Sequence, residues 1–365
     1  MLEDLRKADG PGAAPAAAPA SSAAERSANG SRGPVKVPAA GPSPPSGDAS
    51  GLAAALAPVL RSMCDGRLSE IQWFKSPWQK GGAATGLATW TDAAGTTSDV
   101  VVKLPVGPNE FRWTVGLGSD ASVPRGSASG PTPRVEASGM EIGGYDLCWL
   151  VMERLPGQPL SVKFDARAAT DLVDATARWY ARTAATAPPG DAPATPDWDA
   201  LLTKARDAAK SSGMEQSQRW NKDIKQVQHL LPHLMERWNA RPINTWCHGD
   251  LHPGNALRRS DGTCVLIDLA LVHAGHWVED ALYLERLHWG RPEQLGGLNV
   301  VAALAAARKR QGLNGHEDYV TLANVRRLLM AACVPAFLTK EGHPRYVGAA
   351  LETLTRLLPQ ARHWH

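Results

Sequence analysis

Between residues 71 and 152 the chain carries short apolar runs that are separated by glycine, proline and polar turn residues. Runs of this length and composition are typical of β-strands. A short apolar helix is expected just before them, over 52–60. The pattern therefore predicts a five-stranded sheet, with strands over Ile71–Lys75, Gly86–Thr91, Val100–Leu104, Val135–Ala137 and Leu147–Met152.

The spacing of apolar residues becomes helical after Pro156 and Gly157. Apolar residues recur three and four positions apart over Ala166–Ala187 and over Ile224–Trp238, which predicts two amphipathic helices. Pro232 lies inside the second helix and is expected to bend or split it. A small sheet followed by a larger helical part predicts an α+β protein.

The N-terminal region has a composition that cannot form a core. Between Pro11 and Ser50, 32 of 40 residues are Ala, Pro, Gly or Ser, and aromatic residues are absent. Such a segment buries too little apolar surface to offset the entropy cost of ordering it. We therefore expect residues 1–50 to form a disordered tail, residues 51–152 a β-rich lobe, residues 153–157 a hinge and residues 158–365 a helical lobe.

Composition and charge favour a globular enzyme over other classes of protein. The chain has 365 residues and a net charge of +3, which gives no concentrated basic face for nucleic acid. No run approaches the roughly 18 apolar residues of a membrane-spanning helix, and no apolar leader begins the chain. The five cysteines include no Cys-x-x-Cys pair, which argues against a disulfide framework or a cysteine zinc site. We therefore expect a cytoplasmic protein that binds neither nucleic acid nor membranes.

The chemically informative segment is His248–Asn255, which reads His-Gly-Asp-Leu-His-Pro-Gly-Asn. Gly249, Pro253 and Gly254 prevent a helix, so this segment is expected to be a polar loop. A lone loop aspartate is usually a turn or cap residue. Asp250 is different because it accompanies His248, Asn255 and Asp268. Beside a metal-bound phosphate, a carboxylate can accept or orient the proton of an attacking hydroxyl.

A β-hairpin is expected directly after this loop. Asp261 and Gly262 stand between two apolar runs and are a strong signal for a two-residue turn. A symmetric turn would place Asn255 opposite Asp268, with both side chains on the same face. An amide oxygen and a carboxylate that converge in this way, completed by phosphate oxygens and water, describe a Mg²⁺ site.

The order of these residues is that of kinases: a catalytic-loop aspartate, an asparagine five positions later and an aspartate after the next strand. Together with Leu266-Ile267-Asp268, the segment His248–Asn255 resembles the aminoglycoside phosphotransferase and choline kinase family, small-molecule relatives of the protein kinases. The resemblance covers roughly residues 66–290. It implies a protein-kinase-like two-lobed fold, with a small antiparallel β-sheet lobe that binds ATP and a larger, mostly helical lobe. ATP and Mg²⁺ would be the cofactors.

The resemblance also implies roles for individual residues. Asp250 would be the catalytic residue, and Asn255 and Asp268 would hold the metal. His248 and Asp280 would support the catalytic loop. The residues implied to bind the nucleotide are Lys103 for the α- and β-phosphates, Gly81 and Gly82 in a glycine-containing loop, Glu153 and Leu155 in the hinge segment, and His252.

A glutamate should pair with Lys103 in such a fold, and Glu110 is the best candidate. It lies early in the segment Asn109–Leu117, which would then be the helix of the sheet lobe. The acceptor would be a hydroxyl of a small molecule of the aminoglycoside, amino alcohol or sugar class. The sequence leaves the choice among these classes open, together with the oligomeric state.

Two other functions agree with parts of the same segment. His248 and His252 have the spacing of a helical zinc hydrolase, but Gly249 and Pro253 prevent the helix that would place both imidazoles on one face. A pseudokinase-like module that binds nucleotide without turnover stays open, because the glycine loop has no sharp phosphate-binding pattern.

Overall fold

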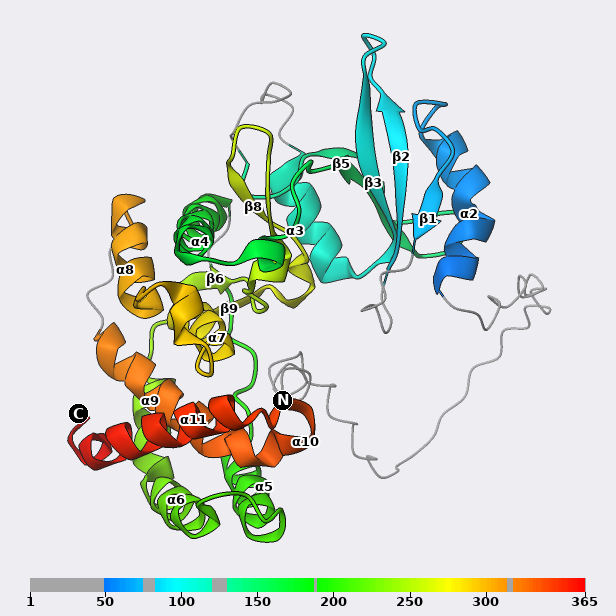
Figure 1. The fold of residues 1–365 in the computed structure, drawn as a ribbon. Coiled ribbons are helices and arrows are strands. Elements are labelled where there is room, and N and C mark those ends of the chain that lie inside the picture. Colours follow the sequence, from blue (N-terminus) through cyan, green and yellow to red (C-terminus); the bar gives the residue numbers. More distant parts are fainter. Residues whose placement is uncertain (1–48, 75–82, 120–129, 187–188, 314–317, 365) are drawn as a thin grey trace, which may run out of the picture.

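The computed structural model describes residues 49–74, 83–119, 130–186, 189–313 and 318–364. One end of the molecule is a five-stranded antiparallel sheet with the strand order β1-β2-β3-β5-β4 (Figure 1). The predicted sheet is confirmed, although the bounds of its strands differ by a few residues from those expected. The strands are β1 (Gln72–Phe74), β2 (Ala84–Thr91), β3 (Thr97–Val106), β4 (Val135–Gly139) and β5 (Cys148–Glu153).

Helices α2 (Ala49–Met63) and α3 (Pro108–Gly118) pack on opposite faces of this sheet. The alternation along β3 explains this arrangement, because neighbouring side chains of a strand point to opposite faces. Val100, Val102 and Leu104 are fully buried in the core that α2 covers. The residues between them face the other side of the sheet, where α3 packs. Both helices agree with the sequence prediction.

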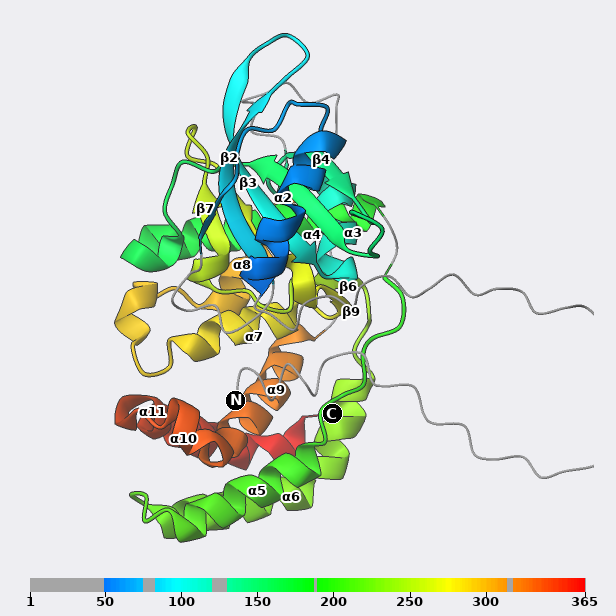
Figure 2. The same cartoon turned by 90° about the vertical axis from the view of Figure 1, so that its right-hand side faces the viewer.

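The rest of the described chain is mainly helical, which confirms the α+β class. Figures 1 and 2 show α4, α7 and α8 in a layer nearer to the sheet and α5, α6, α10 and α11 in a second layer farther away, with α9 between the two layers. These helices are α4 (Ala166–Thr186), α5 (Trp198–Ser211), α6 (Ser217–Asn239), α7 (Val278–Leu287), α8 (Val300–Arg310), α9 (Tyr319–Cys333), α10 (Leu338–Glu341) and α11 (Pro344–Leu357).

Helix α6 contains Pro232 and continues through it, so of the two expected effects, a bend or a split, the split is wrong. A proline removes one hydrogen bond of the helical ladder. Leu234 and Trp238, which follow it, are fully buried in the core of the helical part. Their burial holds the helix together on the C-terminal side of the proline.

Helix α9 and the turn after it form an apolar segment, Tyr319–Phe337. Among the described residues this is the one helix that is long and apolar enough to cross a membrane by length and composition. Its most apolar window is 72% buried inside the protein. Packing in the helical core therefore accounts for its composition.

The hairpin of β7 (Ala256–Arg258) and β8 (Cys264–Leu266) is present, but the predicted register is wrong by one residue. Ala256 pairs with Leu266, and Ile267 donates its backbone N–H to the carbonyl of Asn255 over 3.0 Å. Asn255 therefore lies opposite Ile267 and not opposite Asp268.

The cause of the shift is the length of the turn. Arg259 donates its N–H to the carbonyl of Thr263, and Gly262 donates to the carbonyl of Arg259. Three residues therefore connect the strands, with Gly262 in the left-handed conformation at φ +86°. Hairpin loops of three residues usually combine a type I turn with such a residue. The extra residue moves the pairing by one position.

Arg259 ties this hairpin to the end of β5. Its guanidinium group donates to the carbonyls of Gly130 and Thr132, both over 2.8 Å, and to Oε1 of Glu153 over 2.7 Å. The same oxygen of Glu153 accepts the backbone N–H of Arg134 over 3.0 Å. The planar, multiply donating guanidinium group suits such a junction, and it links the helical part to the sheet.

Replacement of Arg259 by alanine is expected to lower the free energy of unfolding by about 2 to 4 kcal/mol, because charge-assisted hydrogen bonds to partly buried acceptors are lost. Urea denaturation measures this change. Arg154→Ala is the matched control, since Arg154 pairs with Asp99 while both side chains are exposed. Such a surface pair contributes less than about 1 kcal/mol. Equal losses in the two variants would contradict the assigned role of Arg259.

Candidate active site

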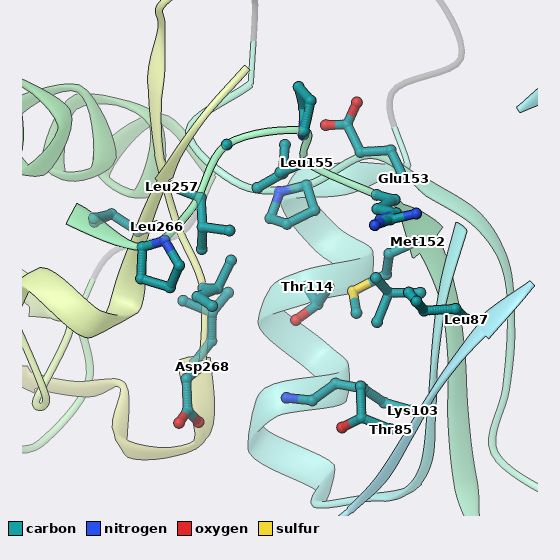
Figure 3. A pocket seen from close by; sticks show the side chains of 18 of the residues that line it. Thr85, Leu87, Lys103, Thr114, Met152, Glu153, Leu155, Leu257, Leu266 and Asp268 are labelled. Carbon is teal, nitrogen blue, oxygen red and sulfur yellow. The ribbon is translucent and has the colours of Figure 1, made fainter. Parts of the chain in front are cut away.

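A cavity of about 550 Å³ lies where the sheet, the hinge segment and the β7–β8 hairpin meet. Figure 3 shows that its two ends differ in character. Met152 and Leu155 lie toward one end, and Leu257 on the hairpin faces them. Lys103 and Asp268 approach the other end from opposite walls. The cavity can therefore accept a molecule with a flat apolar part and a charged part.

Lys103 on β3 forms an ion pair with Glu110 in the first turn of α3. Glu110 is 7% exposed, so the pair lies largely out of water. The neighbouring residue, Asn109, donates from its side chain to the carbonyls of Ala270 and Val272, both over 2.9 Å. Helix α3 therefore contacts both Lys103 on the sheet and the segment that follows Asp268.

At position 249, the loop with Asp250 adopts a backbone conformation that only glycine allows. Gly249 adopts φ +78°, and a Cβ atom there would lie 2.1 Å from the carbonyl oxygen of Leu271. The carboxylate of Asp280 accepts the backbone N–H groups of His248 and Gly249 over 2.7 and 2.9 Å. Asp280 thus holds the loop through its backbone.

The imidazole of His248 is fully buried beneath the same loop. Its Nδ1 accepts the backbone N–H of Asp250 over 3.3 Å, while Nε2 lies 3.1 Å from the carbonyl oxygen of Ile267. Burial lowers the pKa of this histidine below its ordinary value, despite the nearby charge of Asp280. A neutral imidazole with its proton on Nε2 satisfies both contacts. His248 therefore joins the loop to the residue before Asp268.

Asp250 is 5% exposed and is held by Asn255. The amide nitrogen of Asn255 donates to the backbone carbonyl of Asp250 over 3.1 Å and to its Oδ2 over 3.2 Å. Since the amide nitrogen of Asn255 faces Asp250, the amide oxygen of Asn255 points away from Asp250. His252 Nε2 lies 3.7 Å from the same Oδ2.

Asp268 lies two residues after strand β8 and adopts the left-handed backbone conformation, with φ +63°. Non-glycine residues in this conformation are uncommon, and aspartate tolerates it better than most. This turn brings the carboxylate of Asp268 to the charged end of the cavity (Figure 3). The predicted route to the site, direct pairing with Asn255, is replaced by this backbone turn.

The described part of the chain contains no group of three or more His, Cys, Asp or Glu side chains that could hold a metal ion by themselves. The Asp268 carboxylate, which lines the cavity, and the Asn255 amide oxygen are both hard oxygen donors. Mg²⁺ is usually held by one or two carboxylates together with substrate phosphates and water. These two residues therefore fit Mg²⁺ and do not fit a closed all-protein metal centre.

In the hinge segment, Glu153 and Leu155 both line the cavity. The carboxylate of Glu153 is engaged by Arg259 and by the N–H of Arg134, so the backbone of this residue is the part that can meet a ligand. Gly81 and Gly82 lie outside the described residues.

A buried ion cluster lies behind the loop, between β9 (His273–Gly275) and α7. Glu279 faces His273 at 3.8 Å and Arg241 at 3.2 Å. Burial opposes the charged form of His273, but the hydrogen bond and charge of Glu279 raise the pKa of His273 to about 9. Burial also opposes the charge of Glu279, yet His273, Arg326 and Arg241 hold its pKa well below the usual range.

The sequence prediction missed Tyr283, which donates its hydroxyl to Oδ1 of Asp250 over 2.5 Å. A signal for it was present, because Tyr283 follows Asp280 by three positions on a helix and therefore shares its face. Asn109 and Arg259 were missed as well. Their contacts join segments far apart in the chain, and no local pattern indicates such contacts.

Comparison with solved structures finds several phosphotransferases, all with low sequence identity. An aminoglycoside phosphotransferase from Alicyclobacillus acidocaldarius is 15% identical, with a TM-score of 0.47 over 81% of this chain and 92% of that one. A choline kinase from Streptococcus pneumoniae is 12% identical, with a TM-score of 0.43 over 83% of this chain and 98% of that one. A macrolide 2'-phosphotransferase from Brachybacterium faecium is 14% identical, with a TM-score of 0.42 over 82% and 97%.

No curated protein sequence matches the chain. The sequence model described as "Phosphotransferase enzyme family" matches residues 122–323, which is more than half of the chain. The matched region contains the loop with Asp250, the β7–β8 hairpin and Asp268. With the five-stranded antiparallel sheet and the larger helical part, this agrees with the two-lobed kinase-like fold implied by the sequence. The chain therefore belongs to the phosphotransferase enzyme family.

Proposed function

We propose that this protein transfers the γ-phosphoryl group of Mg²⁺-bound ATP to a hydroxyl group of a small molecule. One observation carries the proposal. The cavity has an apolar end under the hinge segment and a charged end where Lys103 and Asp268 face each other. A nucleoside triphosphate has the same polarity, since the faces of its base are apolar and its phosphates are charged. Residues 51–152, 153–157 and 158–365 would then be the nucleotide-binding lobe, the hinge and the acceptor lobe.

In this proposal the base occupies the apolar end, beside Met152 and the backbone of Glu153 and Leu155. Lys103 neutralises charge on the phosphates, and Glu110 holds the lysine in place. Gly81, Gly82 and His252 are the other residues we assign to the phosphates. The volume of about 550 Å³ is within the usual range for cofactor pockets.

Asn255 and Asp268 are assigned to Mg²⁺, in keeping with their oxygen donors. When bound, this ion supplies positive charge that binds the phosphate oxygens and offsets the negative charge that develops during transfer. The contacts of the Asn255 amide nitrogen with Asp250 support the assignment, because they leave the amide oxygen for a cation. They also keep the metal ligand and the catalytic residue in a fixed relation.

Asp250 is assigned to the acceptor. It orients the acceptor hydroxyl and takes its proton while the oxygen of the acceptor forms a bond to the γ-phosphorus. The bond between the γ-phosphorus and the bridging oxygen breaks, and ADP leaves with the electron pair of that bond. Acceptor-dependent release of ADP, measured with aminoglycosides, amino alcohols and sugars, tests the proposal and identifies the acceptor class.

Replacement of Asp268 by alanine is expected to abolish most of the rise in melting temperature that Mg²⁺ and ATP cause in the wild-type protein. A ligand that binds only the folded state stabilises it by mass action, and this variant removes a metal ligand. Asp261→Ala is the matched control, since Asp261 is an exposed aspartate on the same hairpin, outside the cavity. If the wild type shows no shift at millimolar nucleotide, the nucleotide site is wrong.

Asp250→Asn is expected to lower phosphoryl transfer by about 10²- to 10⁴-fold while Mg²⁺-ATP affinity stays nearly unchanged. The reason is that Asp250 is assigned to the acceptor and not to the nucleotide. Lys103→Ala should weaken nucleotide binding as well as the rate, because its charge meets the phosphates before and during transfer. Isothermal titration and steady-state kinetics separate the two effects.

The same measurements distinguish an enzyme from a module that only binds nucleotide. Such a module has no acceptor-dependent turnover to lose in either variant. Near wild-type transfer by Asp250→Asn to an established acceptor would contradict the role of this residue, even if nucleotide binding occurs as proposed.

A further inference from the structure

The hydroxyl of Tyr283 donates a hydrogen bond to Oδ1 of Asp250, and the two oxygens are 2.5 Å apart. This distance is typical of a hydroxyl that donates to an ionised carboxylate, and such bonds are stronger than those between neutral groups. Asp250 is 5% exposed, so little water competes for the contact. A strong contact with the proposed catalytic residue therefore comes from a helix outside the catalytic loop.

Helix α7 presents Tyr283 and Asp280 to the loop from one face. The two residues are three positions apart, which makes them neighbours on a helix surface. Asp280 holds the backbone N–H groups of His248 and Gly249. Tyr283 reaches the side chain of Asp250, one residue farther along the loop. The same helix thus fixes the backbone of the loop and the direction of its aspartate.

Helix α7 is well suited to hold a side chain in place. Ala281, Leu282 and Leu284 on either side of Tyr283 are buried to 1% exposure or less in the core of the helical part. A side chain carried by a packed helix is positioned more precisely than one on a loop. Movement of Tyr283 away from Asp250 would therefore require movement of the helix or a change of rotamer.

The two oxygens of the Asp250 carboxylate have different surroundings. Oδ1 accepts the hydroxyl of Tyr283, whereas Oδ2 accepts the amide of Asn255 over 3.2 Å and lies 3.7 Å from His252. The carboxylate cannot rotate without exchanging these partners. Oδ2 is consequently kept on the side of the residues assigned to the metal and the phosphates.

We propose that Tyr283 is a positioning residue that fixes the Asp250 carboxylate, so that Oδ2 is the oxygen that receives the acceptor hydroxyl. This role rests on the proposed phosphoryl transfer. In it, Tyr283 contacts Asp250 and does not contact the nucleotide. The phenol covers Oδ1 and keeps water from using that oxygen. Tyr283 therefore affects the rate of phosphoryl transfer and the ratio of transfer to the acceptor over transfer to water.

Tyr283→Phe tests this role, since it removes the hydroxyl and keeps the ring on α7. We expect kcat for acceptor phosphorylation to fall about 10- to 100-fold, which corresponds to the loss of one hydrogen bond to a charged group. The KM for ATP should stay within about twofold. The ratio of ADP formed to acceptor phosphorylated should rise, because water gains access to Oδ1. A residue with a merely structural role would not change this ratio.

Tyr319→Phe is the matched control. Tyr319 packs its ring against Trp277 at a centroid distance of 5.2 Å, and its hydroxyl forms no hydrogen bond with any described residue. This variant also removes one phenolic hydroxyl from a partly buried tyrosine. Its kcat and its ratio of ADP to phosphorylated acceptor should match those of the wild type.

Several outcomes would overturn the inference. If the wild type transfers phosphate and Tyr283→Phe keeps the same kcat and the same ratio, Tyr283 does not position Asp250. If Tyr283→Phe also loses its melting-temperature shift with Mg²⁺ and ATP, the contact supports nucleotide binding and not the positioning of Asp250. A phosphate group on Tyr283 after incubation with Mg²⁺ and ATP, detected by mass spectrometry, would make the tyrosine an acceptor. Absence of transfer by the wild type would instead contradict the proposed function itself, and the inference with it.

Discussion

The carboxylate of Asp280 is the interaction on which the candidate site depends. It is 1% exposed and accepts three hydrogen bonds, from the N–H groups of His248 and Gly249 and from the hydroxyl of Tyr180 over 2.8 Å. A buried charge is tolerated only when its hydrogen bonds are satisfied. The loop supplies two of these donors, in a backbone conformation that only glycine permits at position 249. The same contacts thus stabilise the buried charge and the conformation of the loop.

The contacts of this loop extend to the cavity. His248 reaches the carbonyl of Ile267, and Ile267 donates to the carbonyl of Asn255. The segment after Asp268 is held in turn by Asn109 on α3, next to the glutamate that pairs with Lys103. A displacement of α3 would therefore disturb both the lysine and the segment that follows Asp268. The two walls of the cavity are thus linked through packed elements as well as through residues 153–157.

The sequence could predict what depends on local periodicity and on short motifs. The five strands, α2 and α3 follow from runs of apolar residues, and the loop His248–Asn255 follows from its glycines and proline. The hairpin was predicted, but its register was not, because the choice between a two-residue and a three-residue turn at Gly262 depends on small differences in backbone energy. The position of Asp268 was missed for the same reason.

Contacts between distant segments form the second class of features that the sequence could not show. Arg259 and Asn109 each bond to backbone carbonyls more than 100 residues away, and any carbonyl of the chain could have served as a partner. Tyr283 is an intermediate case. Its position on the face of Asp280 was predictable, whereas its contact with Asp250 required the loop to be placed.

The first turn of α7 carries two adjacent carboxylates that the fold stabilises in different ways. Glu279 lies among His273, Arg241 and Arg326, so its charge is balanced by cations behind the loop. Asp280 has neutral donors from the loop instead. Both lie at a helix N-terminus, where the helix dipole favours negative charge. The N–H groups that Asp280 accepts belong to His248 and Gly249, so its charge orients the segment of the loop directly before Asp250.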